Sequence, residues 1–232
     1  MGKNYHTNEM VICSVGKIDP NYFKRLVNQY FDGMPANILP SERKKFTGYI
    51  PQSKEVKKDT FQSHCIIGTE AYDFKHELRL PMVLLSNILG GNSMNSRLNM
   101  TLRERNGIAY NVEANYTPYT DTGIFMVYFG TELSNLYKAL HLVEREFSLL
   151  REKRMGILQL SKTKKQLIGQ LAISNENRED LMLTLGRSYL YFDKVDSLST
   201  VVGKIEKITA DDIFNVANEM LDMNRLSKLI FQ

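Results

Sequence analysis

Hydrophobic and polar positions follow two different periods along this chain. A period of two predicts strands over residues 61–68, 110–119, 123–131 and 226–231. A helical period predicts helices over residues 77–89, 93–105, 134–152, 158–172, 178–192, 198–205 and 210–221. The run at 124–129 is apolar on both faces, so we expect its strand to lie inside the sheet. Strands placed mostly early and helices massed late predict an α+β fold, a two-layer mixed sheet with helices on one face.

The N-terminal segment reads as a strand followed by a helix. Residues 10–15 form an apolar run, and Asp19 and Pro20 suit the N-cap and the first position of a helix that ends near Gly33. Prolines among charged residues then indicate a linker. We therefore divide the chain into a βα unit at 1–32, a linker at 33–59 and an α+β domain at 60–232.

Composition and charge narrow the class of protein. The 232 residues are 43% hydrophobic and 24% charged, with a formal net charge of +4, and these values are ordinary for a soluble globular protein. No apolar run approaches the ~18 residues needed to span a bilayer, and the first residues lack the apolar core of a signal peptide. We expect a soluble, cytoplasmic protein with no membrane span.

The densest group of cations lies in the predicted linker rather than on a folded face. Nucleic-acid binding requires cations on a folded surface with interleaved aromatic side chains. We therefore expect no nucleic-acid partner. The group consists of Arg43, Lys44, Lys45, Lys54, Lys57 and Lys58.

The histidines and cysteines lack the spacing of a metal site. A zinc site built on an inverted His-x-x-Glu-His motif needs two imidazoles on adjacent helical turns with a glutamate between them. His141 and Glu144 begin such a motif, but Arg145 stands where the second histidine belongs, and a guanidinium has no lone pair to give. We expect no metal ligand, no cofactor and no catalytic residue in this chain. The other histidines and the two cysteines are His6, His64, His76, Cys13 and Cys65.

The segment from Leu89 to Tyr110 has the most specific pattern in the chain. It combines the pair Gly90-Gly91, a short polar helix, a stop at Gly107 and the start of an aromatic strand. This segment resembles the C-terminal half of the M16 zinc metallopeptidases, the pitrilysin and mitochondrial-processing-peptidase family. The resemblance extends over most of the chain and implies the LuxS/MPP-like metallohydrolase fold, as one half of an internally duplicated protein. It also implies that the βα unit closes a preceding half, so we expect the chain to begin partway through a longer protein.

Arg103 and Tyr110 are the candidate site residues. In the family that this chain resembles, an arginine and a tyrosine seven positions apart hold the substrate backbone, and Arg103 and Tyr110 have that spacing. A guanidinium and a phenol hydroxyl are donors that suit a carbonyl oxygen on which negative charge develops. Arg97 and Arg105 are alternatives for the cationic role.

Each candidate also has a purely structural interpretation. If a regular helix begins at Ser93, Met94, Leu98 and Leu102 form its apolar stripe, and Arg103 lies with Ser96 and Asn99 on the polar side as a solvated residue. Tyr110 shares strand parity with Val112 and Ala114, which is typical of a core tyrosine.

The resemblance implies the substrate-binding C-terminal region of a zinc-dependent endopeptidase that hydrolyses peptides in a chamber between two halves. Zinc is then expected in the full-length enzyme or in its partner, and the isolated chain is expected to be inactive. The expected partners are a peptide substrate and either the N-terminal zinc-bearing half or a paired subunit. The alternative is a non-catalytic binding or structural subunit of the same fold that partners a zinc-bearing chain.

Overall fold

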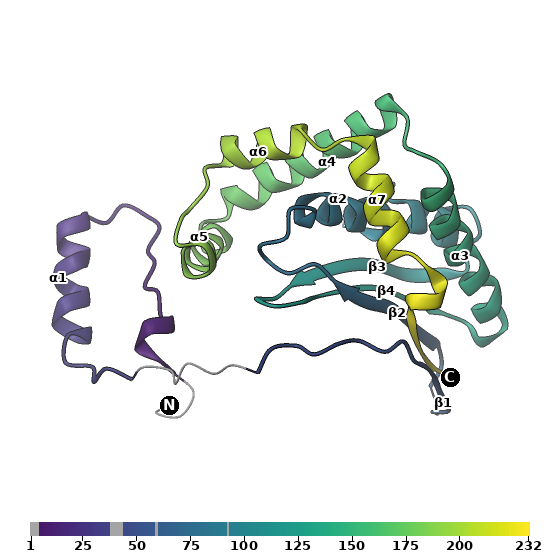
Figure 1. Ribbon diagram of the computed structural model, residues 1–232, viewed down its shortest axis with the longest axis horizontal. Coiled ribbons are helices and arrows are strands. Elements are labelled where there is room, and N and C mark those ends of the chain that lie inside the picture. Colours follow the sequence, from purple (N-terminus) through teal and green to yellow (C-terminus); the bar gives the residue numbers. More distant parts are fainter. Residues whose placement is uncertain (1–4, 38–43, 59, 92) are drawn as a thin grey trace. The chain divides into compact units, whose positions relative to one another are not determined.

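The described part of the chain contains one five-stranded sheet with mixed pairing. The computed structural model describes residues 5–37, 44–58, 60–91 and 93–232. The strand order is β1-β5-β2-β4-β3 (Figure 1). β1 pairs with β5 in parallel, and the other pairs are antiparallel. The strands are β1 Ser53–Val56, β2 Ser63–Ala71, β3 Ala109–Pro118, β4 Gly123–Thr131 and β5 Ser227–Phe231. The predicted α+β fold is confirmed, and β4 lies inside the sheet as expected.

By its contacts the chain forms two compact units. The N-terminal unit comprises Met1–Lys44 and Gly169–Val201, and the sheet unit comprises Lys45–Ile168 and Val202–Gln232. Two helices, α4 (Ile157–Glu176) and α6 (Leu198–Glu206), contribute residues to both units. Parts of the predicted βα unit (1–4), of the predicted linker (38–43 and 59) and Asn92 lie outside the described residues.

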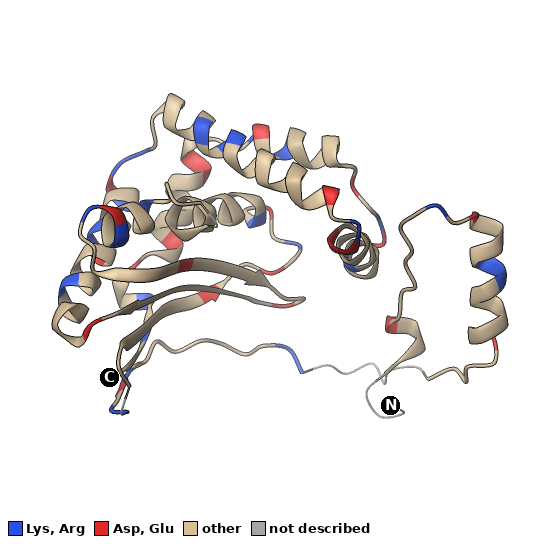
Figure 2. Ribbon diagram, turned by 180° about the vertical axis from the view of Figure 1, so that it is seen from behind, with Lys and Arg blue, Asp and Glu red and all other residues tan. Residues whose placement is uncertain are grey.

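Helices cover one face of the sheet in the sheet unit. Figure 1 shows α2 (Arg79–Gly90), α3 (Leu136–Glu152) and α7 (Ala210–Met220) on the same side of the strands. Alternate residues of β2 and β4 point to this side and are buried, among them Ile67, Phe125 and Phe129, which have no exposed surface. The helices carry Lys and Arg mixed with Asp and Glu, as Figure 2 shows.

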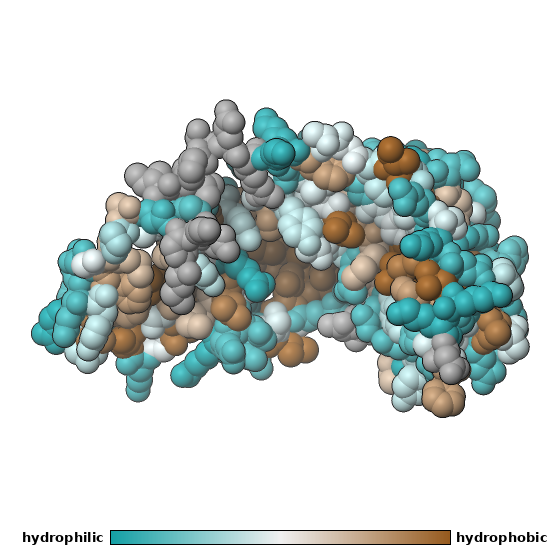
Figure 3. Space-filling model, turned by 90° about the horizontal axis from the view of Figure 1, so that it is seen from below, coloured by the Kyte–Doolittle hydropathy of each residue, from teal (hydrophilic) through white to brown (hydrophobic). Residues whose placement is uncertain are grey.

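The opposite face of the sheet is only partly covered. Residues that precede β1 contact this face through Tyr49, whose hydroxyl lies 3.1 Å from the Gly68 carbonyl oxygen and 2.7 Å from Ser227 Oγ. Ile124 and Met126 of β4 are 47% and 36% exposed. Figure 3 looks onto the molecule from below and shows apolar surface between polar patches.

Two α-helices lie wholly within the described part of the N-terminal unit, α1 (Pro20–Phe31) and α5 (Arg178–Phe192), and neither buries a residue. Both begin as the sequence predicts, because Asp19 accepts a hydrogen bond from the Tyr22 amide at 2.8 Å and Asn177 accepts from two amides of α5. An apolar groove of about 510 Å³ separates residues 10–13 from α5. Cys13 approaches the helix at Gly186, where an added Cβ would lie 3.5 Å from the Cys13 Cβ.

Two predictions about the first 60 residues were wrong at the level of secondary structure. Residues 10–15 form no strand, because no described strand pairs with them, and an extended segment becomes a strand only beside another one. The predicted linker at 33–59 contains β1, which pairs with β5 from Ser53 to Val56. This edge strand is exposed along its first three residues, so its sequence lacks the apolar alternation that marks a half-buried strand.

The remaining elements follow the predicted order. Short 3-10 turns are found at η1 (Thr7–Glu9), η3 (Leu133–Asn135) and η4 (Met223–Arg225). Among the described residues, η2 (Asn99–Glu104) is a π-helix where a regular helix was predicted.

Candidate functional site

The candidate site begins where α2 ends, at the pair Gly90-Gly91. Gly90 packs against β3 so closely that an added Cβ would lie 2.5 Å from the Ala114 amide nitrogen. Gly91 is the C-cap, and a Cβ there would lie 2.6 Å from Asn87 Nδ2. Gly90 therefore lets the helix lie directly on the strand that carries Tyr110, whereas Gly91 leaves room for Asn87 of the same helix.

Beyond this pair the chain enters the π-helix η2. Its backbone bonds span five residues, as in the bond from the Arg105 amide to the Met100 carbonyl at 3.0 Å. Such wide turns occur frequently at functional sites. The expected regular helix from Ser93 was wrong for this reason.

The polar side expected for that helix was also wrong. Ser96 and Asn99 are buried, whereas Met94, expected on the apolar stripe, is 69% exposed. Asn99 Nδ2 donates to Ser96 Oγ at 2.8 Å and to the Val112 carbonyl at 3.3 Å. These two residues thus tie the start of the π-helix to β3.

Gly107 turns the chain from the π-helix into β3. Its φ is +60°, in the left-handed region that favours glycine, and its amide donates to the Arg103 carbonyl at 2.9 Å. The ladder between β3 and β4 is irregular between Ala109 and Val112, where a bulge interrupts the register. Ala109 and Val112 remain buried, but Tyr110 is 82% exposed. The interpretation of Tyr110 as a core residue was therefore wrong, because the bulge shifts it off the face that Val112 occupies.

The structure brings Arg103 and Tyr110 together on the surface. The guanidinium carbon of Arg103 lies 5.7 Å from the centre of the Tyr110 ring, a cation–π contact. The Arg103 side chain is 39% exposed, and its Nε lies 3.4 Å from Glu104 Oε1. Both donors are reachable from solvent on one surface, and their contact with a substrate stays a prediction. Of the alternative cations, Arg105 is exposed, whereas Arg97 is held by Glu146 at 2.8 Å.

Buried polar residues are concentrated beneath this pair. Five of the eight buried polar or charged residues in the described chain border the 93–110 segment, namely Ser96, Asn99, Thr101, Thr131 and Glu146. Thr131 donates to the Ile108 carbonyl, and Asn106 donates to the Thr101 carbonyl at 2.8 Å. Since a buried polar group needs a partner to avoid a large desolvation penalty, this network fixes the backbone that carries Arg103 and Tyr110.

Sequence reasoning missed Glu146. The signal was present, because Glu146 lies three residues after Val143 on the inner stripe of α3, where an apolar side chain is expected. A charged residue in that position indicates a buried partner, but the sequence does not show which one.

The comparisons with known proteins place this segment in a family. The model of the peptidase M16 inactive domain matches residues 1–167. The chain belongs to the peptidase M16 inactive-domain family. As an M16 inactive domain it is similar to the uncharacterized zinc protease YmxG of Bacillus subtilis, with 26% identity over 94% of this chain and 53% of that protein. An uncharacterized zinc protease of Rickettsia felis is 28% identical over 98% of this chain and 55% of its own length.

The fold of the M16 inactive domain is also seen in solved structures. The peptidase M16 inactive domain from Pseudomonas fluorescens superposes with a TM-score of 0.82 and 18% identity, covering 94% of this chain and 52% of that chain. The chain thus spans about half the length of the curated relatives it matches. The resemblance read from the segment ending at Tyr110 is confirmed.

The described residues of this M16 inactive domain do not form a site that fits a zinc ion. Among the described residues no three His, Cys, Asp or Glu side chains lie close enough together to hold a metal. His64 Nδ1 lies 2.8 Å from the Tyr128 hydroxyl, and the His76 ring stacks on Tyr72. Burial raises the pKa of the Cys65 thiol to about 12, which keeps it protonated and unreactive near neutral pH.

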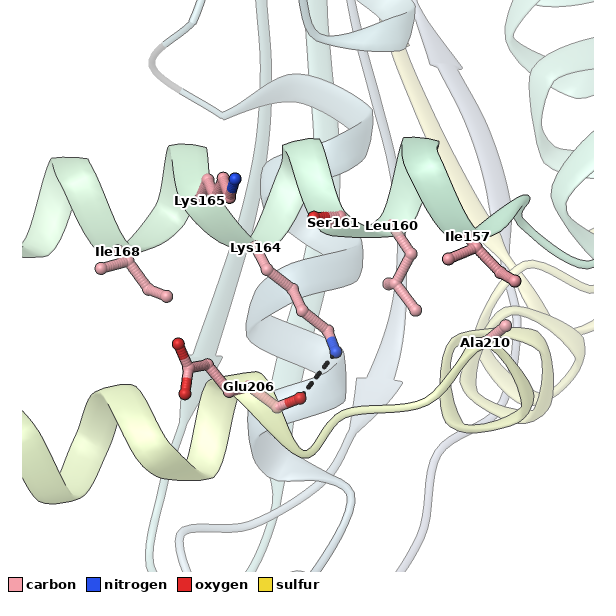
Figure 4. A pocket seen from close by; sticks show the side chains of 8 residues that line it. All are labelled: Ile157, Leu160, Ser161, Lys164, Lys165, Ile168, Glu206 and Ala210. Atoms are coloured by element: carbon pink, nitrogen blue, oxygen red, sulfur yellow. Dashed lines mark hydrogen bonds between the residues drawn. The ribbon is translucent and has the colours of Figure 1, made fainter.

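The sheet unit also has a groove whose lining residues lie outside this segment. It is a groove of about 370 Å³ on one side of α4, between Ile157 and Ile168. Figure 4 shows Lys164 reaching across it to the Glu206 carbonyl, at 2.8 Å from Nζ. Its lining combines apolar side chains with the polar residues Ser161, Lys164, Lys165 and Glu206. No described helix is long and apolar enough to cross a membrane.

Proposed function

We propose that this chain forms the substrate-binding C-terminal region of a zinc-dependent endopeptidase. Its curated relatives are named zinc proteases and are about twice as long as the matched region. Zinc, its bound water and the general base would come from the rest of the full-length protein or from a partner chain, because the described residues of this chain do not fit the metal. A peptide would bind between that part and this one.

The observation that supports the proposal is the prepared surface at Arg103 and Tyr110. Both side chains are reachable from solvent and in contact, while the neighbouring backbone is held by hydrogen bonds from Asn99 and Asn106. The guanidinium and the phenol hydroxyl are donors that would bind carbonyl oxygens of an extended peptide. Donors that are already positioned before the reaction stabilise developing charge most effectively.

The βα unit at 1–32 is proposed to complete the sheet of the preceding half. Its helix α1 buries no residue, and Tyr30 and Phe31 are 71% and 45% exposed. The apolar residues 10–15 have no regular secondary structure and no described strand beside them. An apolar segment beside an amphipathic helix would gain stability by pairing with the edge of another sheet. A cytoplasmic location is likewise a prediction, for which fractionation of cells is the direct measurement.

Reconstitution tests the proposal. The full-length protein, or this chain mixed with a zinc-bearing partner, should cleave an unstructured peptide. Arg103→Ala or Tyr110→Phe should then lower kcat/KM by about 10–1000-fold, the range for losing one transition-state donor. Arg105→Ala is the matched control, because it removes an exposed arginine two positions away.

Two outcomes would contradict the proposal. Equal loss of activity in Arg105→Ala and Arg103→Ala would show that general positive charge, rather than the Arg103–Tyr110 pair, binds the peptide. If the full-length protein is supplied with zinc and binds the peptide without cleaving it, the result would instead support a non-catalytic binding subunit.

A further inference from the structure

Glu146 occupies an unusual place in the sheet unit. The inner stripe of α3 is otherwise apolar, with Leu140, Val143 and Phe147 nearly or fully buried. Glu146 is 8% exposed and is the only charged residue in the buried class across the described part of the chain. A carboxylate in such a place needs strong partners, because its desolvation is otherwise unfavourable by several kcal/mol per ion.

Both oxygens of this carboxylate are used, and both partners come from the segment that leads to Arg103. Arg97 Nε donates to Glu146 Oε2 at 2.8 Å, and Thr101 Oγ1 donates to Oε1 at 2.8 Å. Arg97 lies just before the π-helix and Thr101 lies inside it, two residues before Arg103. One side chain of α3 therefore holds the π-helix at its start and at its middle.

The π-helix itself is an arrangement that the backbone does not prefer. Runs of bonds that span five residues are rare, whereas the same residues could form a regular helix. In a regular helix the direction of Arg103 relative to Thr101 would differ, since the turn per residue is larger. The hydrogen bond from Thr101 to Glu146 holds the turn that carries Arg103.

We propose that Glu146 is a positioning residue that fixes Arg103 over Tyr110. It acts through Arg97 and Thr101 and touches neither the substrate nor Tyr110. The importance of this role rests on the proposed function, but the positioning can be measured without substrate. Loss of Glu146 would leave the fold in place and release the guanidinium from the ring.

The absence of tryptophan from the chain gives a direct probe. In Tyr110→Trp the single indole reports on the cation 5.7 Å from the ring that it replaces. Adding Arg103→Ala to this variant defines the fluorescence of the indole without its cation. Adding Glu146→Gln should change the emission in the same direction, by at least about half as much as Arg103→Ala does. Glu144→Gln is the matched control, because it makes the same substitution two positions away on α3 and also ends an ion pair, with Lys228 at 3.5 Å.

Circular dichroism and thermal unfolding establish that each variant is folded at the temperature of the measurement. If Glu146→Gln does not fold, Thr101→Val decides, because it removes one hydrogen bond to the carboxylate with almost no change of shape. An emission change in folded Glu146→Gln, with none in Glu144→Gln, supports the positioning role, and unchanged emission in folded Glu146→Gln overturns it. Where Glu146→Gln does not fold, the same two outcomes in Thr101→Val decide. Peptide binding by the reconstituted enzyme is a separate measurement, so a failed proposal on function remains distinguishable from a failed proposal on Glu146.

Discussion

The sheet unit and the N-terminal unit both contain amphipathic helices, but the two units differ in how many side chains those helices bury. In the sheet unit, Phe129 and Phe147 have no exposed surface, and α3 has buried residues along its whole length. In the N-terminal unit, α1 is strongly amphipathic and well capped but buries no residue. Caps and periodicity decide where a helix forms, whereas burial requires a second surface. The helix α1 of the N-terminal unit therefore keeps its apolar side chains exposed, whereas α3 of the sheet unit buries its apolar side chains in the core.

The largest expected difference between the units concerns their cysteines. Cys65 in β2 has no exposed surface and a pKa raised by burial to about 12, whereas Cys13 beside α5 is partly exposed. Only about one Cys65 in 10⁴ is a thiolate at pH 8, and the thiolate is the reactive form. Iodoacetamide at pH 8 should therefore modify Cys13 at least about 1000-fold faster than Cys65.

Mass spectrometry of the alkylated protein measures both rates. The control is Cys13→Ser, in which Cys65 is the single remaining cysteine. In denaturant the two rates should converge. Rapid modification of Cys65 in the folded protein would mean that β2 opens easily, and the contrast between the units would disappear.

Large-to-small substitutions should separate the units next. Phe129→Ala removes a fully buried ring from β4 and should lower the free energy of unfolding by about 3–5 kcal/mol. Phe31→Ala removes a ring that is 45% exposed on α1 and should change the main unfolding transition by less than about 1 kcal/mol. Urea unfolding followed by circular dichroism gives both values. Equal effects would show that α1 belongs to the same cooperative core as the sheet.

Two helical glycines should respond with opposite signs. Gly90→Ala places a methyl group 2.5 Å from the Ala114 amide nitrogen and should be destabilising by about 1–3 kcal/mol. Gly169 of α4 has no atom within 4 Å of an added Cβ, and Gly169→Ala should be stabilising by up to about 1 kcal/mol. Thermal unfolding of the two variants measures the difference. A stable Gly90→Ala protein would show that α2 can move off β3.

The smallest expected effect is at the candidate site itself. Arg103→Ala removes an exposed ion pair and a surface cation–π contact, so the free energy of unfolding should change by no more than about 0.5 kcal/mol. The test is whether the same variant that loses peptide cleavage keeps its unfolding midpoint. A loss of several kcal/mol would assign Arg103 to the stability of the fold.

The sequence predicts those features that local patterns control. Strand β4, helix α5 and the Asp19 cap are found where their residues predict them. The spacing of Arg103 and Tyr110 identifies a pair that the structure places in contact. These features depend on periodicity, on capping residues and on a segment shared with the M16 family. Each of these signals is contained in a short stretch of the chain.

Features that depend on distant hydrogen bonds could not be predicted. β1 is a polar edge strand and forms only because β5, more than 170 residues later, offers a parallel partner. The π-helix is bonded through Thr101 to Glu146 of α3, and the exposure of Tyr110 depends on a bulge against β4. In each case the deciding partner lies on another element, where a pattern along the chain does not show it.

The bulge in β3 also has a consequence for self-association. β3 is the last strand of the described sheet, so the side that does not face β4 could serve as a template for a strand of another copy. A second chain can add only along a regular run of backbone donors and acceptors. The bulge between Ala109 and Val112 interrupts that run at one end, and Pro118, which has no amide hydrogen, ends it at the other. The irregularity that exposes Tyr110 therefore also shortens the free edge on which fibrous aggregation would begin.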